Sequence, residues 1–543
     1  MMLLWTLVVL VVLVAFRFPR TGSSCFKALA QALATLAERR GWALLLVGLL
    51  SGLACAGLSL CTRLPEPGIH DEFSYLLAAD TFAHGRLTNP PHPLGVHFES
   101  MHILQQPTYA SKYPPGQGLA LAAGQILGGH PIAGVWASTA LACAAIYWML
   151  LAWLPSRWAL LGGLLTALNP LVLSWSQCYW GGAVAMAGGA LVLGGFRRIV
   201  AEPRIQDAIW LGLGVALLAN SRPFEGLILS LMVAVALLLW MLLPPRPPRR
   251  LVLVKFVLPT SLVLTLTGLL MGFYNYRITG NPLQMPYSVH EAAYSITPIF
   301  LWQQPAPAPV YHHPVIRDFQ TVWAFSFYQR QQSLRGFVAD CGRKIFTLGK
   351  WYLWSFVMLV PLLCALPGAR TDPWLRLTLL FSLLFTASLF PVTWTLQPHY
   401  AAPVAGLFVL LSMESLRHLG AWQWRGQPIG YSLAGGLLVV CLVASFMFCR
   451  RHSHFSEGNF ARAHLLAELR SQEGQHLVVV RYSPKHSPHD EWVYNEADID
   501  GAKVLWAREM EATQNRKLLD YFKTRKIWLL EPDVKPLRIA PYP

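Results

Sequence analysis

Long apolar stretches recur from one end of the chain to the other. They lie near residues 2–16, 41–61, 131–153, 158–175, 182–196, 207–220, 226–243, 251–272, 351–367, 377–394, 401–416 and 428–448. A helix needs about 20 apolar residues to cross a bilayer, and most of these stretches approach that length. A single soluble core could not bury so many of them. The pattern therefore predicts an all-α polytopic membrane bundle with about twelve transmembrane helices.

The composition agrees with a chain embedded in a membrane. Of the 543 residues, 54% are hydrophobic and 13% are charged, whereas a soluble domain usually has about 25% charged residues. The formal net charge is +16. Because the basic residues are spread over short loops instead of one soluble face, we attribute this charge to the positive-inside bias of membrane proteins and expect no nucleic-acid partner.

The loops between the apolar stretches form two sets that alternate along the chain. One set is short and basic, with about 17 Lys and Arg over roughly 70 residues, whereas the opposite set has about 11 over roughly 165. The basic set is expected to face the cytoplasm. The predicted outer segments are 62–130, 176–181, 220–225, 273–350, 395–400 and the C-terminal stretch.

The predicted domains are a transmembrane module, 1–450, and a small soluble α/β domain on the outer face, 451–543. In the second part, 460–471 and 516–525 have helical spacing, and the strand candidates are 476–482, 502–507 and 526–531. Helix–strand and strand–helix–strand order favours parallel strands. The segment 486–500 is rich in His and acidic residues but lacks the spacing of a metal site, so we expect a surface loop there.

The first long outer loop carries two motifs with candidate chemistry. It opens with PGIHDEFSYLLAADTFAHGRLTNP at 67–90, in which Asp71 and Glu72 precede apolar residues at helical spacing. Such carboxylates can cap a helix or act in acid–base catalysis. The loop continues with SKYPPGQG at 111–118, where Lys112 precedes a rigid Tyr-Pro-Pro turn. This lysine can bind phosphate or extend its charge to the membrane surface.

Together these residues resemble the first outer loop of the GT-C superfamily, the integral-membrane glycosyltransferases that use polyprenyl-phosphate sugars. The protein O-mannosyltransferases and lipid A aminoarabinose transferases are the nearest families in pattern. The second motif, Lys-Tyr-Pro-Pro at 112–115, departs from the lysine–proline–proline element of the family by one tyrosine. The resemblance is clear over residues 65–200 and looser to residue 420. It rests on Asp71, Glu72, Tyr75, Ala79, Asp80, Gly85 and the 112–115 motif.

The resemblance implies a GT-C-like fold and an inverting sugar transfer. The family uses the first acidic residue of the loop as catalytic base, which falls on Asp71. Glu72 is expected to orient the acceptor or Asp71, and Tyr75, Lys112 and Tyr113 are expected to contact substrate. The family includes metal-using and metal-free members, and no motif in this sequence decides whether a divalent metal takes part.

The resemblance also implies partners and a location. The partners are a polyprenyl-phosphate sugar donor, membrane lipids and an acceptor hydroxyl on a glycan, a lipid or a protein. The location is the bacterial inner (plasma) membrane, with the active site and the C-terminal domain in the periplasm.

Four further residues at the predicted outer face are candidates for binding the donor. Arg222 can form bidentate contacts with phosphate, or an ion pair with Glu225 at i,i+3 spacing. Arg277 follows the eighth apolar stretch and can bind phosphate or anchor the chain at the interface. His399 and Tyr400 begin the eleventh stretch, where they can donate to phosphate or sugar, or where the histidine can be a buried, satisfied residue.

Three other functions are compatible with a polytopic chain. A transporter or flippase places ionisable residues near the bilayer midplane, whereas the middle of these apolar stretches is almost free of charge. The second alternative is a polysaccharide polymerase or ligase on another fold. The third is a non-catalytic scaffold in which the acidic pair only caps a helix.

Overall fold

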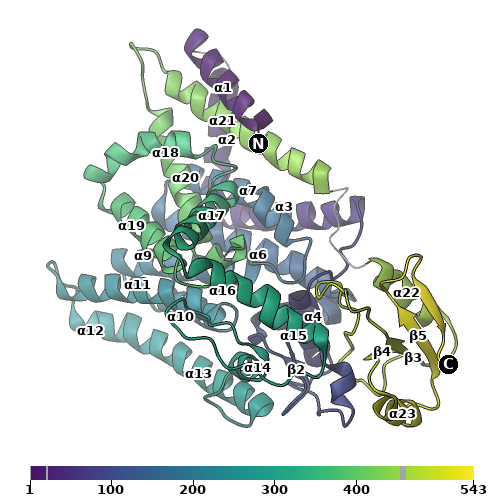
Figure 1. The fold of residues 1–543 in the computed structure, drawn as a ribbon. Coiled ribbons are helices and arrows are strands. Elements are labelled where there is room, and N and C mark those ends of the chain that lie inside the picture. Colours follow the sequence, from purple (N-terminus) through teal and green to yellow (C-terminus); the bar gives the residue numbers. More distant parts are fainter. Residues whose placement is uncertain (1, 20–22, 395, 453–459) are drawn as a thin grey trace.

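The computed structural model of the chain describes residues 2–19, 23–394, 396–452 and 460–543. Figure 1 shows a large bundle of helices, with a small α/β unit formed by the C-terminal segment beside it. The predicted fold class, a helical membrane bundle with a small C-terminal α/β unit, is confirmed.

Within the described ranges, seven helical segments are long and apolar enough to cross a membrane. They are α3 (Arg40–Cys61), α6 (Pro131–Trp153), α9 (Ala183–Ala201), α11 (Pro223–Leu242), the continuous run of α12 (Arg249–Val252), the π-helical turn η2 (Leu253–Val257) and α13 (Leu258–Thr279), the run of η5 (Pro398–Val404) and α20 (Ala405–Gly420), and α21 (Ile429–His452). Shorter apolar helices are α1 (Met2–Arg17), α10 (Ile205–Ala219), α18 (Leu359–Ala365) with η4 (Leu366–Arg370), and α19 (Pro373–Ser388). The chain is therefore an integral membrane protein.

Three segments differ from the predicted pattern. The stretch 158–175 is broken into α7 (Ser156–Ala167) and α8 (Pro170–Trp175), because a residue before proline avoids the helical region. The stretch 351–367 is interrupted at 354–356, where three residues have positive φ, and only α18 follows as a helix. The basic loop 17–40 contains a helix of its own, α2 (Ser23–Glu38).

The centre of the bundle is formed by α6 and α9, which pack against each other and against α3 and α10. Small residues allow this close approach. A Cβ atom on Gly189 of α9 would lie 1.7 Å from the carbonyl oxygen of Pro403 in η5, so only glycine fits there. This contact holds η5, which begins with the predicted site residues His399 and Tyr400, against the central helices.

Two groups of short elements connect the spans on the side of the candidate site. The first outer loop forms α4 (His70–Ala83), η1 (Gly95–Phe98), β1 (Ile103–Leu104), β2 (Ala110–Ser111) and α5 (Pro115–Gly128). The second forms α14 (Pro286–Tyr294), α15 (Pro314–Asp318), the π-helical turn η3 (Phe319–Ala324), α16 (Phe325–Gln331) and α17 (Leu334–Tyr352). The helical spacing read after Asp71 and Glu72 is realised as α4.

The C-terminal unit has the predicted strand–helix–strand order. Its elements are α22 (Phe460–Ser471), β3 (His476–Val480), β4 (Val504–Arg508), α23 (Ala512–Tyr521), β5 (Lys526–Glu531) and β6 (Arg538–Pro541). The sheet order is β4-β3-β5-β6, and β3 is parallel to both β4 and β5, as predicted. The sequence did not indicate β6, which pairs antiparallel with β5.

The C-terminal unit packs directly on the first outer loop, close to α4 (Figure 1). The ring of Tyr494 stacks on that of Phe73 with centroids 3.9 Å apart, and the backbone N–H of Ala497 donates to Oδ2 of Asp80 at 2.8 Å. The expectation that 486–500 is a surface loop is wrong, because Trp492 and Val493 are buried. Their apolar side chains belong to the core of the C-terminal unit, together with residues of α22 and the sheet.

Candidate active site

The five predicted outer segments that lie between spans meet on one side of the bundle. The backbone N–H of Gly116 donates to the carbonyl of Asn220 at 2.7 Å, and Gln117 Nε2 donates to the carbonyl of Tyr179 at 2.8 Å. A Cβ atom on Gly116 would lie 2.6 Å from the Asn220 oxygen, which explains a glycine directly after the two prolines. The remaining two segments join through the side chains of Lys112, Arg222 and Tyr400, described below.

Asp71 is the accessible carboxylate of this region. It lies in the first turn of α4, and 30% of its side chain is exposed. The phenol of Tyr113 donates a hydrogen bond to its Oδ1 atom, and Nε2 of His102 lies 3.9 Å from its Oδ2 atom. Tyr113 in turn stacks on Tyr75, with ring centroids 4.6 Å apart. The carboxylate is thus positioned by neighbours on one side and remains open on another.

Glu72 points into the chain instead. Its Oε2 atom accepts the backbone N–H groups of Gly68 and Ile69 at 2.8 and 3.3 Å, and its Oε1 atom accepts that of Tyr179 at 2.9 Å. Burial raises the pKa of Glu72 to about 7, although the three backbone donors oppose this shift. Glu72 therefore joins the start of α4 to the segment 176–181, and its expected part in orienting acceptor or base stays a prediction.

Lys112 is buried and already has an anionic partner. Its ammonium lies 2.9 Å from Oε1 of Glu291 in α14, and Nδ1 of His290 lies 3.2 Å from the same oxygen. The ammonium also lies 4.8 Å from the ring centroid of Tyr287. Burial works to raise the pKa of Glu291, but Lys112 and His290 hold it below its usual value. Any anion that reaches Lys112 must share it with this carboxylate.

Arg222 differs from Lys112, because its guanidinium forms no ion pair within 4.0 Å with a described residue, although Glu225 is within electrostatic reach. It precedes α11 and lies over the ring of Tyr400, 5.0 Å from the centroid. The ion pair with Glu225 that the spacing allowed is not formed within 4.0 Å, and no described side chain accepts a hydrogen bond from Arg222. Burial, with Asp71 and Glu225, raises the pKa of Tyr75 to about 12, whereas Arg222 lowers it. Tyr75 therefore lies within electrostatic reach of both Asp71 and Arg222.

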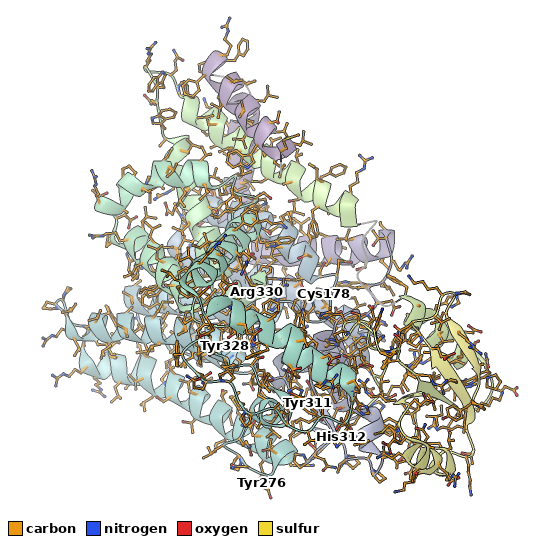
Figure 2. All side chains as sticks on the ribbon, viewed as in Figure 1. Cys178, Tyr276, Tyr311, His312, Tyr328 and Arg330 are labelled. Carbon is orange, nitrogen blue, oxygen red and sulfur yellow. The ribbon has the colours of Figure 1, made fainter. Side chains whose placement is uncertain are left out.

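Of the other predicted binding residues, some lie near Arg222 and one lies away from it. His399 is buried, with its ring 4.2 Å from that of Trp180 and 4.6 Å from that of Tyr400. Arg277 is exposed near the end of α13, and its guanidinium lies 5.9 Å from the ring centroid of Phe273. The neighbouring Tyr276 lies at the rim of the molecule (Figure 2). The structure thus brings Tyr400 to the site with Arg222, and it leaves Arg277 outside.

A small pocket opens beside Lys112, between α5, α13 and α14. Most of its wall is apolar or aromatic, and Lys112 provides the only cationic group among the lining residues. They are Lys112, Pro114, Pro115, Ala219, Asn220, Met271, Tyr274, Asn275, Met285, Pro286 and Tyr287.

Several residues of the site escaped sequence reasoning. Glu291, Tyr287 and His102 lie outside the motifs of the sequence. His102 nevertheless lies beside Asp71, and its backbone is left-handed (φ 64°). Its carbonyl accepts the Ser74 hydroxyl at 2.6 Å. A non-glycine residue held in this region costs free energy and is often found at functional sites. The sequence places Glu291, Tyr287 and His102 in predicted outer loops. Many other residues share that position, so it could not single out these three.

Metal binding was left open by the sequence. Across residues 2–19, 23–394, 396–452 and 460–543, no group of three or more His, Cys, Asp or Glu side chains is arranged to hold a metal ion.

Comparisons with known proteins identify the fold. No protein-family model and no curated protein matches the sequence. Among solved structures, ArnT from Cupriavidus metallidurans in the apo state aligns with a TM-score of 0.50 at 12% identity, over 91% of this chain and 93% of that one. ArnT bound to undecaprenyl phosphate gives the same TM-score and identity, over 89% and 92%. The chain has the GT-C fold.

An archaeal protein with the GT-C fold also matches. The oligosaccharyltransferase of Archaeoglobus fulgidus, in a complex with Zn and sulfate, aligns with a TM-score of 0.51 at 13% identity, over 89% of this chain and 67% of that one. In the alignment with the apo form of that archaeal protein, the present chain spans 64% of the archaeal protein's length. The GT-C fold expected from the 67–90 and 112–115 motifs is thus confirmed, whereas the individual roles of the site residues stay predictions.

Proposed function

We propose that this chain is a membrane glycosyltransferase that moves a sugar from a polyprenyl-phosphate donor to an acceptor hydroxyl. The observation that carries the proposal is that an accessible carboxylate, Asp71, and a guanidinium with no ion pair within 4.0 Å, Arg222, both lie within electrostatic reach of Tyr75. Sugar transfer from a phosphate carrier needs a base for the acceptor and a cation for the leaving phosphate. The GT-C fold supports the proposal.

The donor phosphate would bind to Arg222 first. Its guanidinium can form two parallel hydrogen bonds to phosphate oxygens. Glu225 acts on it electrostatically, but no described carboxylate forms an ion pair with it within 4.0 Å. Lys112 is the second cation, shared with Glu291. The ArnT structure with undecaprenyl phosphate supports a carrier lipid of the polyprenyl class.

The transfer step then follows from the positions of base and cation. The acceptor oxygen attacks the anomeric carbon of the sugar while Asp71 takes the hydroxyl proton. The bond between the anomeric carbon and the phosphate oxygen breaks on the opposite face, which inverts the configuration, and polyprenyl phosphate leaves with the bonding electron pair. A positioned base contributes about 10²–10⁴-fold to such a step, or roughly 3–5 kcal/mol of barrier. Arg222 would stabilise the charge on the departing phosphate.

The proposed location is the periplasmic face of a bacterial inner membrane. Support comes from the basic residues on the opposite face, where Arg198 lies within electrostatic reach of Arg40 and 3.9 Å from Asp207. Basic residues collect on the cytoplasmic side of membrane proteins.

The test uses the full-length protein in nanodiscs, supplied with a labelled polyprenyl-phosphate sugar and membranes from the source organism. The expected result is label transferred to an acceptor, and a loss of about 10²-fold or more in Asp71→Asn, which keeps the shape and removes the basicity. Glu202→Gln is the matched control, since that exposed carboxylate pairs with Arg204 on the opposite side. Parent-level transfer by Asp71→Asn, or movement of the donor across the bilayer with its sugar–phosphate bond intact, would refute the proposal.

A further inference from the structure

A strip of aromatic rings extends outward from the region of Asp71. Its members, here called the aromatic platform, are Phe319, Trp323, Phe327, Trp394 and His489. Phe319 and Trp323 stack with centroids 4.8 Å apart, and Trp323 lies 5.1 Å from Phe327 and 5.9 Å from Trp394. His489, from the C-terminal unit, meets Trp323 edge-on at 4.8 Å. Three distant parts of the chain thus supply one continuous row of rings, whose inner member, Phe319, is buried.

The backbone explains the alignment of the strip. Phe319, Trp323 and Phe327 are four residues apart, and the first two belong to the π-helical turn η3. A π-helix has more residues per turn than an α-helix, so side chains at i and i+4 lie almost directly above one another. Such turns are rare and are frequent at functional sites.

The platform begins beside the proposed base. The ring of His70, which directly precedes Asp71, lies 4.9 Å from Phe319 and 5.9 Å from His489. The ring of His102 lies 5.7 Å from Phe319, and its Nε2 atom is 3.9 Å from Asp71. The buried rings of His70 and Phe319 thus connect the accessible part of the platform with the neighbourhood of Asp71.

The outer part of the platform is accessible. Trp323 is 37% exposed, and His489 is exposed as well. Asp490 follows His489 and is also exposed, and Arg330 lies over the ring of Phe327 at 4.6 Å. Aromatic faces bordered by hydrogen-bonding and charged side chains are thus available from outside.

We propose that the aromatic platform binds a sugar ring of the acceptor, so that the acceptor is a saccharide. A pyranose has C–H faces that pack on aromatic rings and a rim of hydroxyl groups that pair with polar side chains. Both kinds of partner are present here. A tryptophan anchored at the membrane interface presents its ring to lipid headgroups, whereas Trp323 is covered on one edge by His489 of the C-terminal unit, next to the charged Asp490.

This inference rests on the proposed transferase function for its meaning, but its test does not depend on transfer. The probes are six-residue oligomers of glucose and of N-acetylglucosamine, titrated against the intact protein in nanodiscs and followed by tryptophan fluorescence. A Ser- and Thr-rich peptide and vesicles of phosphatidylglycerol are the probes for the other acceptor classes. The expected result is binding of at least one oligosaccharide, weakened about ten-fold or more in Trp323→Ala, which corresponds to about 1.4 kcal/mol.

Three controls make the result decisive. Trp323→Phe keeps a ring and should keep most of the binding, which separates stacking from loss of fold. Trp302→Ala removes an exposed tryptophan that stacks on Phe300 and makes no ring contact with the described platform residues, and binding should not change. Glu202→Gln, at an exposed carboxylate that pairs with Arg204 on the opposite side, should bind the oligosaccharide as the parent does.

The possible outcomes separate the two proposals. Saccharide binding that needs Trp323, without sugar transfer in any assay, would support the platform and contradict the transferase. Transfer that Trp323→Ala leaves unchanged would support the transferase and overturn the platform. Failure of both oligosaccharides to bind, or Trp323-dependent binding of the peptide or the vesicles in their place, would also overturn it.

Discussion

The ammonium of Lys112 lies 2.9 Å from the carboxylate of Glu291, although 179 residues separate the two positions in the sequence. The pair joins the first outer loop to the second and buries most of both side chains. In a buried pair, removal of one partner leaves the other charge uncompensated, which is more costly than removal of both.

This relationship predicts a non-additive effect on stability. Lys112→Met should lower the melting temperature by several degrees, and adding Glu291→Gln should recover part of the loss. Thermal unfolding of the four proteins of this cycle in detergent gives the coupling directly. Changes that simply add across the cycle would show that the two side chains are not coupled.

The same pair also predicts an effect on the donor. Glu291→Gln removes the competing carboxylate, so the protein should bind undecaprenyl phosphate several-fold more tightly, provided that the lipid phosphate reaches Lys112. Microscale thermophoresis with the lipid measures the change. Unchanged affinity would restrict Lys112 to a structural role and leave Arg222 as the phosphate ligand.

Arg222 is expected to contribute more to donor binding than any other cation of the site. Arg222→Lys keeps the charge but loses the paired N–H groups, and each charge-assisted hydrogen bond contributes about 1.5–3 kcal/mol. The affinity for undecaprenyl phosphate should therefore fall about ten-fold or more. Arg335→Gln, at an exposed position in α17, is the matched control. A ten-fold loss in the control as well would point to a non-specific effect of charge.

His102 is predicted to position Asp71 through a strained backbone. His102→Ala places a residue that disfavours positive φ at this point, which should cost about 1–2 kcal/mol of stability. His102→Asn tolerates the left-handed conformation and should fold normally, yet it lacks the ring beside Asp71. Its kcat should fall about ten-fold while the donor KM stays constant. His84→Asn, an exposed histidine at the end of α4, should leave kcat unchanged.

The buried histidines predict a loss of stability in acid. Burial lowers the pKa of both His70 and His290 to about 4, although Glu491 and Asp71 oppose this for His70. Between pH 6.5 and 4 the unfolded chain binds protons that the folded chain does not, so stability present above pH 6.5 is lost as the pH falls toward 4. Each histidine contributes at most about 3 kcal/mol to this change.

Melting temperatures measured from pH 7.5 to 5 test this expectation. The parent should lose stability steadily below pH 6.5, and His70→Gln should give a shallower slope. An identical slope in the variant would assign the acid sensitivity to other groups.

Local features of the sequence predicted the helical bundle and the start of the site. Apolar stretches of the length of a bilayer, and an acidic pair followed by helical spacing, depend on neighbouring residues only. The spans, α4 and the parallel strands of the C-terminal unit could therefore be read in advance. The same reasoning failed where packing overrides hydropathy, as at 354–356, where the chain turns inside an apolar stretch.

The sequence by itself determined that Asp71 and Glu72 lie together in an outer loop, and that Arg222 and Lys112 lie in segments on the same side. Only the tertiary structure decided that Asp71 is open while Glu72 accepts three backbone N–H groups, and that Lys112 has an ion-pair partner while Arg222 has none among the described residues. The physical reason is that hydropathy and charge spacing fix which side of the membrane a residue faces. Its partners depend on how distant helices pack, and that information is spread over the whole chain.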